Sequence, residues 1–291
     1  MLRRYISLSM IDLHLHSTAS DGTLAPAALV RMAVERGLSA AALTDHDTTA
    51  GLAEFIAAAE GTGVRAVAGV ELSCSWYSGT MHILGLFINP DCPELAALLC
   101  EVRTSRDRRN DAVLARLRHL GLHLPEGAVR ADAADPVIGR PHIARALVEL
   151  GHCSDLPDAF ARYLGSGRPA YIRRHLPLPE AVIRIIHAAG GVAVWAHPLA
   201  QLRHSTAKLR QTARVLQNHG LDGMETHYAD YSAEEALQAQ AVARQVNLLG
   251  CGGSDFHGDN SPGVLMGTGR GALAVPDSIL NALEARAATR G

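Results

Sequence analysis

Histidine and carboxylate side chains recur at short spacing along this chain, in positions where they could bind metal ions. The segment IDLHLHSTASDGT places His14 and His16 one residue apart, with Asp21 five residues further on. Because alternate residues of an extended strand face the same side, the two imidazoles should point in one direction. Imidazole nitrogens and carboxylate oxygens bind Mn, Fe and Zn ions, so this segment predicts one part of a metal site.

Similar residues stand at the boundaries of other segments with strand-like patterns. Nine side chains are candidate metal ligands: His14, His16, Asp21, His46, Glu71, His82, His197, Asp255 and His257. A catalytic zinc-type site takes about three protein ligands and a water, so nine donors suffice for two or three divalent ions. Without cations, clustered carboxylates would repel one another and their pKa values would rise. Each motif alone is weak evidence, but their joint occurrence predicts a metal site.

These residues need a scaffold that gathers distant strand ends, and the hydrophobic pattern predicts one. Strand-like and helix-like stretches alternate through residues 9–88 and again through 178–289. This alternation indicates parallel strands joined by helices, with about seven strands in total. In a βα barrel the carboxyl ends of the strands form one rim, where reactive residues gather. The sequence therefore predicts an α/β barrel.

Helical patterns without a clear strand interrupt the alternation between these two parts. We predict a small helical insertion, a lid over residues 98–175, in a barrel formed by residues 1–97 and 176–291. Residues 101–175 contain 13 arginines and 9 acidic residues. This local positive charge favours an anionic substrate.

Several residues are candidates for contact with that substrate. Arg140 and His142 lie in IGRPHIA, where a Gly-Arg-Pro step leads into a helix, and Arg174 follows in YIRRH. Guanidinium groups suit phosphate oxygens, and a helix N-terminus adds a favourable field. His227, at the end of METHY, could donate a proton to a leaving group or hold phosphate. A structural hydrogen bond is an equally good interpretation of His227.

Other polar residues are expected to have only local roles. Asp47 or Thr48, in LTDHDT, should cap the helix that follows, since short polar side chains favour that position. Arg103, Arg106 and the pair 108–109 should lie on an exposed face of a long helix.

Bulk composition excludes several classes of protein. The net charge is −2 and aromatic residues make up 4% of the chain, which argues against a general nucleic-acid-binding surface. No stretch has the roughly 18 apolar residues that cross a bilayer, and no leader segment is evident. The five cysteines form no CxxC motif, so free thiols and a cytoplasmic location are expected. Lys208 is the only lysine, which disfavours Schiff-base chemistry and a Walker loop.

The motifs DLHLHSTASDGT, LTDHDT, GVELS, VAVWAHP and GGSDFH, in this order, resemble those of the polymerase and histidinol phosphatase (PHP) family. The resemblance covers most of the chain outside the insertion. It implies a hydrolase with a distorted (β/α)7 barrel, a trinuclear metal site and phosphoesterase activity. One ion would be bound by His14, His16, Glu71 and Asp255, a second by Glu71, His82 and His197, and a third by Asp21, His46 and His257. Mn²⁺ is the expected metal, with Zn²⁺ or Fe²⁺ as alternatives.

A narrower resemblance comes from IGRPHIARALVELG and GRPAYIRR. They are similar to a subgroup that hydrolyses the 3′-phosphate of nucleoside 3′,5′-bisphosphates, related members of which trim short RNA from the 5′ end. The resemblance implies attack by a hydroxide that bridges two ions. The expected partners are a small phosphorylated nucleotide and short oligonucleotides, with no membrane; the oligomeric state stays open.

Two other functions remain open at this point. A metal-dependent amidohydrolase acting on C–N bonds also has strand-end histidines, although it often carries a carboxylated lysine and no lysine lies near these motifs. A polymerase-associated nucleic-acid-binding module with vestigial metals is the other. The complete set of nine ligands argues against it.

Overall fold

One sheet of eight strands forms the centre of the computed structural model, which describes residues 10–77, 79–125, 127–129, 138–202 and 205–290. The strand order is β7-β6-β5-β4-β3-β2-β1-β8. The strands are β1 (Met10–Leu15), β2 (Leu38–Leu43), β3 (Arg65–Trp76), β4 (Gly79–Leu86), β5 (Val192–Trp195), β6 (Gly223–Tyr228), β7 (Leu249–Gly253) and β8 (Val275–Pro276). Pairing is parallel within β1–β3 and within β5–β7, but β4 is antiparallel to both neighbours and the short β8 is antiparallel to β1.

The two ends of the sheet meet, so that it is nearly closed into a barrel. The backbone N–H of His16 donates to the carbonyl of Phe256 at 3.0 Å, and that of Asp255 donates to the carbonyl of His14 at 2.9 Å. Glycine at position 253 permits this approach, because a Cβ there would lie 2.4 Å from the Cβ of His14. The distorted α/β barrel predicted from the sequence is confirmed.

A buried carboxylate stabilises this seam. Asp12, on β1, accepts hydrogen bonds from the backbone N–H of Ser254 at 2.9 Å and of Gly267 at 2.8 Å. The hydroxyl of Ser254 also donates to Asp12, at 2.5 Å. The chain that follows β7 is therefore fixed against the first strand.

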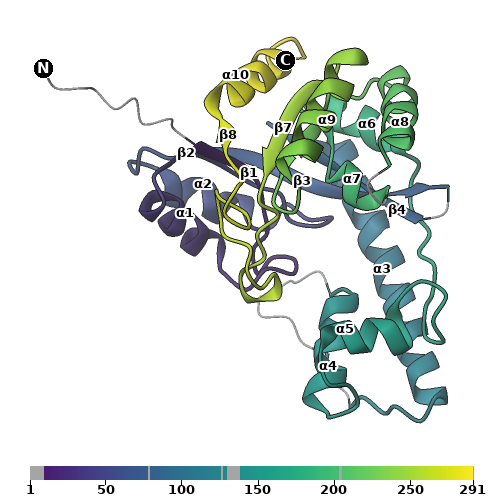
Figure 1. Cartoon of the computed structure of the whole chain (residues 1–291). Helices are drawn as coiled ribbons and strands as arrows, with labels where there is room; N and C mark the ends of the chain where they lie inside the picture. The colour runs from purple at the N-terminus through teal and green to yellow at the C-terminus, as the bar shows by residue number, and fades with distance from the viewer. Residues whose placement is uncertain (1–9, 78, 126, 130–137, 203–204, 291) are drawn as a thin grey trace, which may run out of the picture.

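Helices cover the outside of the barrel (Figure 1). They are α1 (Pro26–Glu35), α2 (Leu52–Ala59), α6 (Pro179–Ala188), the short α7 (Pro198–Gln201), α8 (Thr206–Asn218), α9 (Ala233–Gln245) and α10 (Asp277–Ala287). Proline stands in the first turn of α1 and α6, where its missing N–H costs no helical hydrogen bond. Helix α10 packs across one end of the barrel, with Leu280 and Leu283 in the same buried cluster as Ile11 and Val192 of the strands.

A helical insertion lies at the opposite end of the barrel from α10 (Figure 1). It contains the distal part of α3 (Pro93–His119), with α4 (Arg140–Glu149), α5 (Leu156–Ala159) and a π-helical turn at Phe160–Leu164. Helix α3 buries Leu98 in the barrel's core and Val113 in a separate core of the insertion. The predicted boundary at residue 98 therefore falls inside one continuous helix, and the division into two units stays a prediction.

The predicted cap of the second helix is wrong. Helix α2 begins at Leu52, and its N-cap residue is Gly51 without a side-chain hydrogen bond. Thr48 accepts only from the backbone N–H of Ala50, at 3.2 Å. The carboxylate of Asp47 instead accepts from Ser73 on β3, from its backbone N–H at 2.9 Å and its hydroxyl at 3.1 Å. Among the described helices, none is long and apolar enough to span a membrane.

Candidate metal centre

The nine predicted ligands come together at one rim of the barrel. Backbone pairing with β3 continues past the end of β2: Glu71 of β3 donates its N–H to the carbonyl of Asp45 at 3.1 Å, and Asp47 donates to that of Glu71 at 2.9 Å. This ladder places His46 beside Glu71. The seam described above places the segment with Asp255 beside His14 in the same way.

A first group of donors surrounds one point between β1, β3 and the segment after β7. The Nε2 atom of His14 lies 3.3 Å from an oxygen of Glu71 and 3.3 Å from an oxygen of Asp255. The Nε2 atom of His16 lies 3.2 Å from each of the same two oxygens. These four atoms are mutually within 4.8 Å.

A second group uses the other oxygen of Glu71. His82 Nδ1 lies 3.0 Å and His197 Nε2 3.1 Å from Glu71 Oε1, and the two nitrogens are 3.4 Å apart. The buried carboxylate of Glu71 therefore stands between two clusters of imidazoles.

A third group lies around Asp21. His257 Nε2 is 3.3 Å from Asp21 Oδ1, and His46 Nε2 is 3.9 Å from Asp21 Oδ2. The Nδ1 atom of His16 is 3.8 Å from the same carboxylate, so His16 turns one nitrogen toward each of two groups.

These separations suit shared cations. Two donors that bind one ion at about 2.1 Å lie about 3.0 Å apart at a right angle and about 3.4 Å apart at a tetrahedral angle. The first two groups have this spacing. Buried lone pairs at five atoms have no hydrogen-bond partner among the described residues: His14 Nε2, His16 Nδ1 and Nε2, His46 Nδ1 and Glu71 Oε2. Because unpaired buried polar atoms are costly, the donor set fits divalent ions.

A carboxylate that the sequence analysis missed orients two of the imidazoles. Glu225, fully buried on β6, lies 3.0 Å from His14 Nδ1 and accepts the backbone N–H of His197 at 2.6 Å. A hydrogen bond to Nδ1 directs Nε2 of His14 toward the first group. Glu225 lies in the segment METHY, two residues before His227. In a regular strand this spacing would place both side chains on one face, which is the sequence pattern that could have pointed to Glu225.

Two other imidazoles have similar partners. His257 Nδ1 lies 2.8 Å from the carbonyl of Asp255, and Gln201 Nε2 lies 3.3 Å from His197 Nδ1. His197 and Asp255 also have positive φ angles, 32° and 54°. Non-glycine residues in this left-handed region are uncommon and store strain, which often marks functional sites.

His227 does not join the site. The pairing of β6 with β7 shifts by one residue between Glu225 and His227, so the two side chains no longer share a face. The His227 ring lies 3.3 Å from Gln240 of α9. Tyr228 points to the centre instead, and its hydroxyl donates to Asp255 at 2.9 Å. A proton-donating role for His227 has no contact in its favour.

Four arginines face the candidate metal ligands across a cavity of about 200 Å³. The cavity is lined by His46, His82 and Asp21 on the barrel side and by Arg106, Arg109, Arg140 and Arg174 on the other. The expectation that Arg106 and Arg109 lie on an exposed face is wrong, because their exposed fractions are 9% and 8%. Burial, with repulsion from the neighbouring arginines, lowers the pKa of Arg109.

The Asp47 carboxylate connects this arginine cluster to the barrel. It pairs with Arg106, and Arg174 donates to it at 2.9 Å. Burial opposes ionisation of Asp47, but the two guanidinium groups hold its pKa well below its usual range. Asp47 adopts a φ of 54°, so the backbone is strained where the barrel meets the insertion.

The other two candidates for substrate contact, Arg140 and His142, have different surroundings. Arg140 lines the cavity, and its guanidinium lies over the rings of Phe160 and Tyr171 at 5.9 and 5.6 Å. His142 does not line the cavity. Its Nδ1 accepts the backbone N–H of Gly139 at 3.0 Å, which satisfies a donor at the start of α4.

Comparisons with known proteins agree with this geometry. A model of the PHP domain matches residues 12–117. A 3′,5′-nucleoside bisphosphate phosphatase of Chromobacterium violaceum is 35% identical, over 96% of this chain and 98% of the relative. A 5′-3′ exoribonuclease of Haemophilus influenzae is 37% identical, over 84% and 89%.

Solved structures are similar over nearly the whole chain. A protein of Bifidobacterium adolescentis assigned as a metal-dependent phosphoesterase has a TM-score of 0.84 and 30% identity, over 96% of both chains. An amidohydrolase of Chromobacterium violaceum with bound sulfate and no metal has a TM-score of 0.83 and 35% identity, over 96% of this chain and 97% of its own.

Proposed function

The chain belongs to the PHP domain family and is a metal-dependent phosphoesterase, and from this premise we propose that it removes the 3′-phosphate of nucleoside 3′,5′-bisphosphates. We also propose that it trims short oligonucleotides from the 5′ end. Relatives named for these two activities support the proposal. One observation carries it: the nine candidate metal ligands lie together beside a cavity lined with arginines.

We propose that the three groups of donors hold two to three divalent ions, Mn²⁺ above all. Bound ions would supply positive charge that acidifies water and offsets the charge of a phosphate. Histidines and carboxylates without cysteine favour Mn²⁺, Zn²⁺ or Fe²⁺ over a thiolate-type site. In this assignment Glu71 serves two groups, one with each oxygen.

The arginines would bind the second phosphate of a bisphosphate. Four arginines line the cavity. Arg106 and Arg174 both pair with the Asp47 carboxylate, whereas among the described residues Arg109 and Arg140 form no ion pair with it. Charge-assisted contacts with a phosphate suit such a cluster. The substrate would then span the cavity, with its 5′-phosphate at the arginines and its 3′-phosphate at the metal ligands.

Other residues of the chain would hold the candidate ligands in place. Glu225 and Gln201 fix the rings of His14 and His197 from behind, so that their Nε2 atoms stay directed at the centre. Burial, and the nearby charge of Asp255, raise the pKa of Tyr228. Its hydroxyl therefore keeps its proton and donates it in a hydrogen bond to Asp255.

The test is turnover by purified protein with added Mn²⁺. We expect release of phosphate from a nucleoside 3′,5′-bisphosphate and from p-nitrophenyl phosphate, and no hydrolysis of a simple amide. His14→Ala and Asp255→Ala should reduce turnover by at least about 1,000-fold, since each removes a donor at the reacting centre. His119→Ala, an exposed site on α3, is the matched control.

Two results would contradict the proposal. One is hydrolysis of the amide but of no phosphate ester, which would favour the amidohydrolase alternative. The other is a rate near that of the unmodified protein in both His14→Ala and Asp255→Ala. Circular dichroism of each variant establishes that it is folded. A cytoplasmic location and the role of the insertion as a lid stay predictions.

A further inference from the structure

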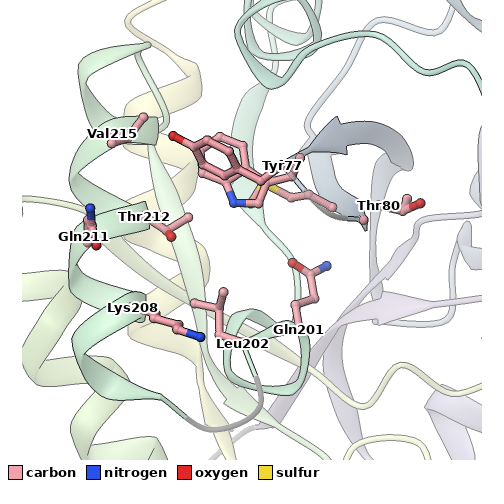
Figure 2. Close-up of a pocket in the computed structure, with 11 residues that line it drawn as sticks. Tyr77, Thr80, Gln201, Leu202, Lys208, Gln211, Thr212 and Val215 are labelled. Carbon is pink, nitrogen blue, oxygen red and sulfur yellow. The ribbon is translucent and has the colours of Figure 1, made fainter. Parts of the chain in front are cut away.

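A second hollow lies beside the candidate metal centre, on the outside of the barrel. It has a volume of about 510 Å³ and lies between the β3–β4 hairpin, α7 and α8. Figure 2 shows Tyr77 of the hairpin on one side and Lys208 of α8 and Gln201 of α7 around the same space. The volume is within the range of small-molecule sites, about 300–1,000 Å³.

The wall of this hollow combines aromatic rings with one cation. Trp76 and Tyr77 form an edge-to-face pair with ring centroids 4.7 Å apart. Tyr77 is 81% exposed at a φ of 25°, so a large ring is held in solvent by a strained backbone. Lys208, the only lysine of the chain, is exposed on α8. Among the described residues that line the hollow, none is acidic.

The hollow adjoins the metal centre through two residues. Thr80 lines both this hollow and the arginine-lined cavity. Gln201 lines the hollow and contacts the candidate ligand His197 at 3.3 Å. Thr80 is therefore the residue at which the hollow and the arginine-lined cavity adjoin, and Gln201 lies behind the ring of His197.

We propose that this hollow binds the second nucleotide of a short 5′-phosphorylated oligonucleotide, with its base against Trp76 and Tyr77 and its phosphate near Lys208. The proposal rests on the proposed function. In both proposed substrates a water adds to phosphorus, the bond from phosphorus to the 3′-oxygen breaks, and a proton passes to that oxygen. The substrates differ only in whether this phosphorus carries another nucleoside.

The additional nucleoside must leave the centre on a side that is free. In the proposed function the arginine side of the cavity holds the first nucleotide's 5′-phosphate, and Thr80 is the residue that the cavity shares with the hollow. Exposed aromatic rings stack on bases of any sequence, and a nearby cation attracts the backbone. These features together favour a nucleotide over an apolar peptide, which would not use Lys208.

Steady-state kinetics of Tyr77→Ala and Lys208→Ala test the proposal. We expect kcat/KM for a 5′-phosphorylated dinucleotide to fall by about tenfold in Tyr77→Ala, the size of a lost base stack. Hydrolysis of a nucleoside 3′,5′-bisphosphate should change less than about twofold. Tyr77→Phe should keep the dinucleotide activity. Arg210→Ala is the charge control for Lys208, because Arg210 faces a different hollow between α8 and α9.

Binding provides a readout that does not need turnover. The chain has two tryptophans, Trp76 and the fully buried Trp195. With metal removed by chelator, a 5′-phosphorylated dinucleotide should quench the fluorescence of the native protein, and Trp76→Phe should abolish that quenching. A nucleoside bisphosphate should quench much less.

The outcomes separate this inference from the proposed function. If the protein hydrolyses the bisphosphate but not the dinucleotide, or if Tyr77→Ala impairs both equally, the hollow is not a nucleotide site and the phosphatase function stands. If neither substrate is hydrolysed, both the proposed function and this inference are wrong. Binding of an apolar peptide in place of the dinucleotide would likewise overturn it.

Discussion

At the scale of single residues, the partners of the candidate ligands matter as much as the ligands. The nine donors could be found from the sequence because histidine and carboxylate residues recur within and just after the segments with strand-like patterns. Glu225 could not be assigned in the same way, because a one-residue shift in the pairing of β6 with β7 decides which of its neighbours faces inward. The sequence left a functional and a structural interpretation of His227 equally open, and the shift turns Tyr228 to the centre instead.

Glu225 should govern how tightly the site binds metal. In Glu225→Gln the hydrogen bond at His14 Nδ1 loses its charge, and we expect Mn²⁺ affinity to fall about 10- to 100-fold. Calorimetric titration with Mn²⁺ measures this, and activity against Mn²⁺ concentration should shift in parallel. Glu180→Gln, an exposed position on α6, should bind Mn²⁺ as the unmodified protein does. Equal affinity in both variants would rule out an orienting role for Glu225.

At the scale of elements, helix α3 joins the insertion to the barrel and brings buried arginines to the rim. The helix itself was predictable from its pattern. Its exposed and buried faces were not, because a run of charged residues normally faces solvent. Arg106 pairs with Asp47 of the barrel, and that contact spans 59 residues of sequence.

The Asp47 contact should position the arginines for substrate. In Asp47→Asn the charge that holds Arg106 and Arg174 is lost while the side-chain shape is kept. We expect KM for a nucleoside bisphosphate to rise about tenfold, which corresponds to about 1.4 kcal/mol, with kcat changed less. Kinetics at saturating Mn²⁺ separate the two constants. Arg108→Ala, an exposed charge on the same helix, is the control, and an effect on kcat alone would refute the positioning role.

At the scale of the whole molecule, the two ends of the barrel have different tasks. The rim with the candidate ligands carries residues with positive φ angles and buried donor atoms that have no hydrogen-bond partner among the described residues. The opposite end contains Asp222, which accepts from the backbone N–H of Ala193 at 2.9 Å and pairs with His187, Arg286 and Arg290. These contacts join β5, α6 and the C-terminal helix. The barrel class was predictable from alternation, whereas the antiparallel β4 and the strand β8 were not, since periodicity carries no strand direction.

Asp222 should contribute to stability in a pH-dependent way. Burial opposes its charge, but the hydrogen bond from His187 and its other partners lower its pKa below the ordinary 3.8. A lowered pKa in the folded state means that the stabilisation is complete above about pH 5 and is lost as the pH falls below 3.8. Asp222→Asn should therefore lower the free energy of unfolding by about 1–3 kcal/mol at pH 7.

Thermal melts of Asp222→Asn from pH 8 to pH 3 measure this difference. We expect a constant decrease in Tm down to about pH 5 and a shrinking one below pH 4. Asp230→Asn is the matched control, because its ion pair with Arg270 is about half exposed and exposed pairs contribute little. A decrease that grows in acid would contradict the sign of the pKa shift.

The seam between β1 and the residues after β7 also sets an order of events during biosynthesis. His14 and His16 leave the ribosome early, while Asp255 and His257 emerge near the end. A nascent chain can bury its first strands long before it holds a full set of donors. A chain that ended before Asp255 would therefore lack two of the candidate ligands and the backbone hydrogen bonds that close the barrel against β1.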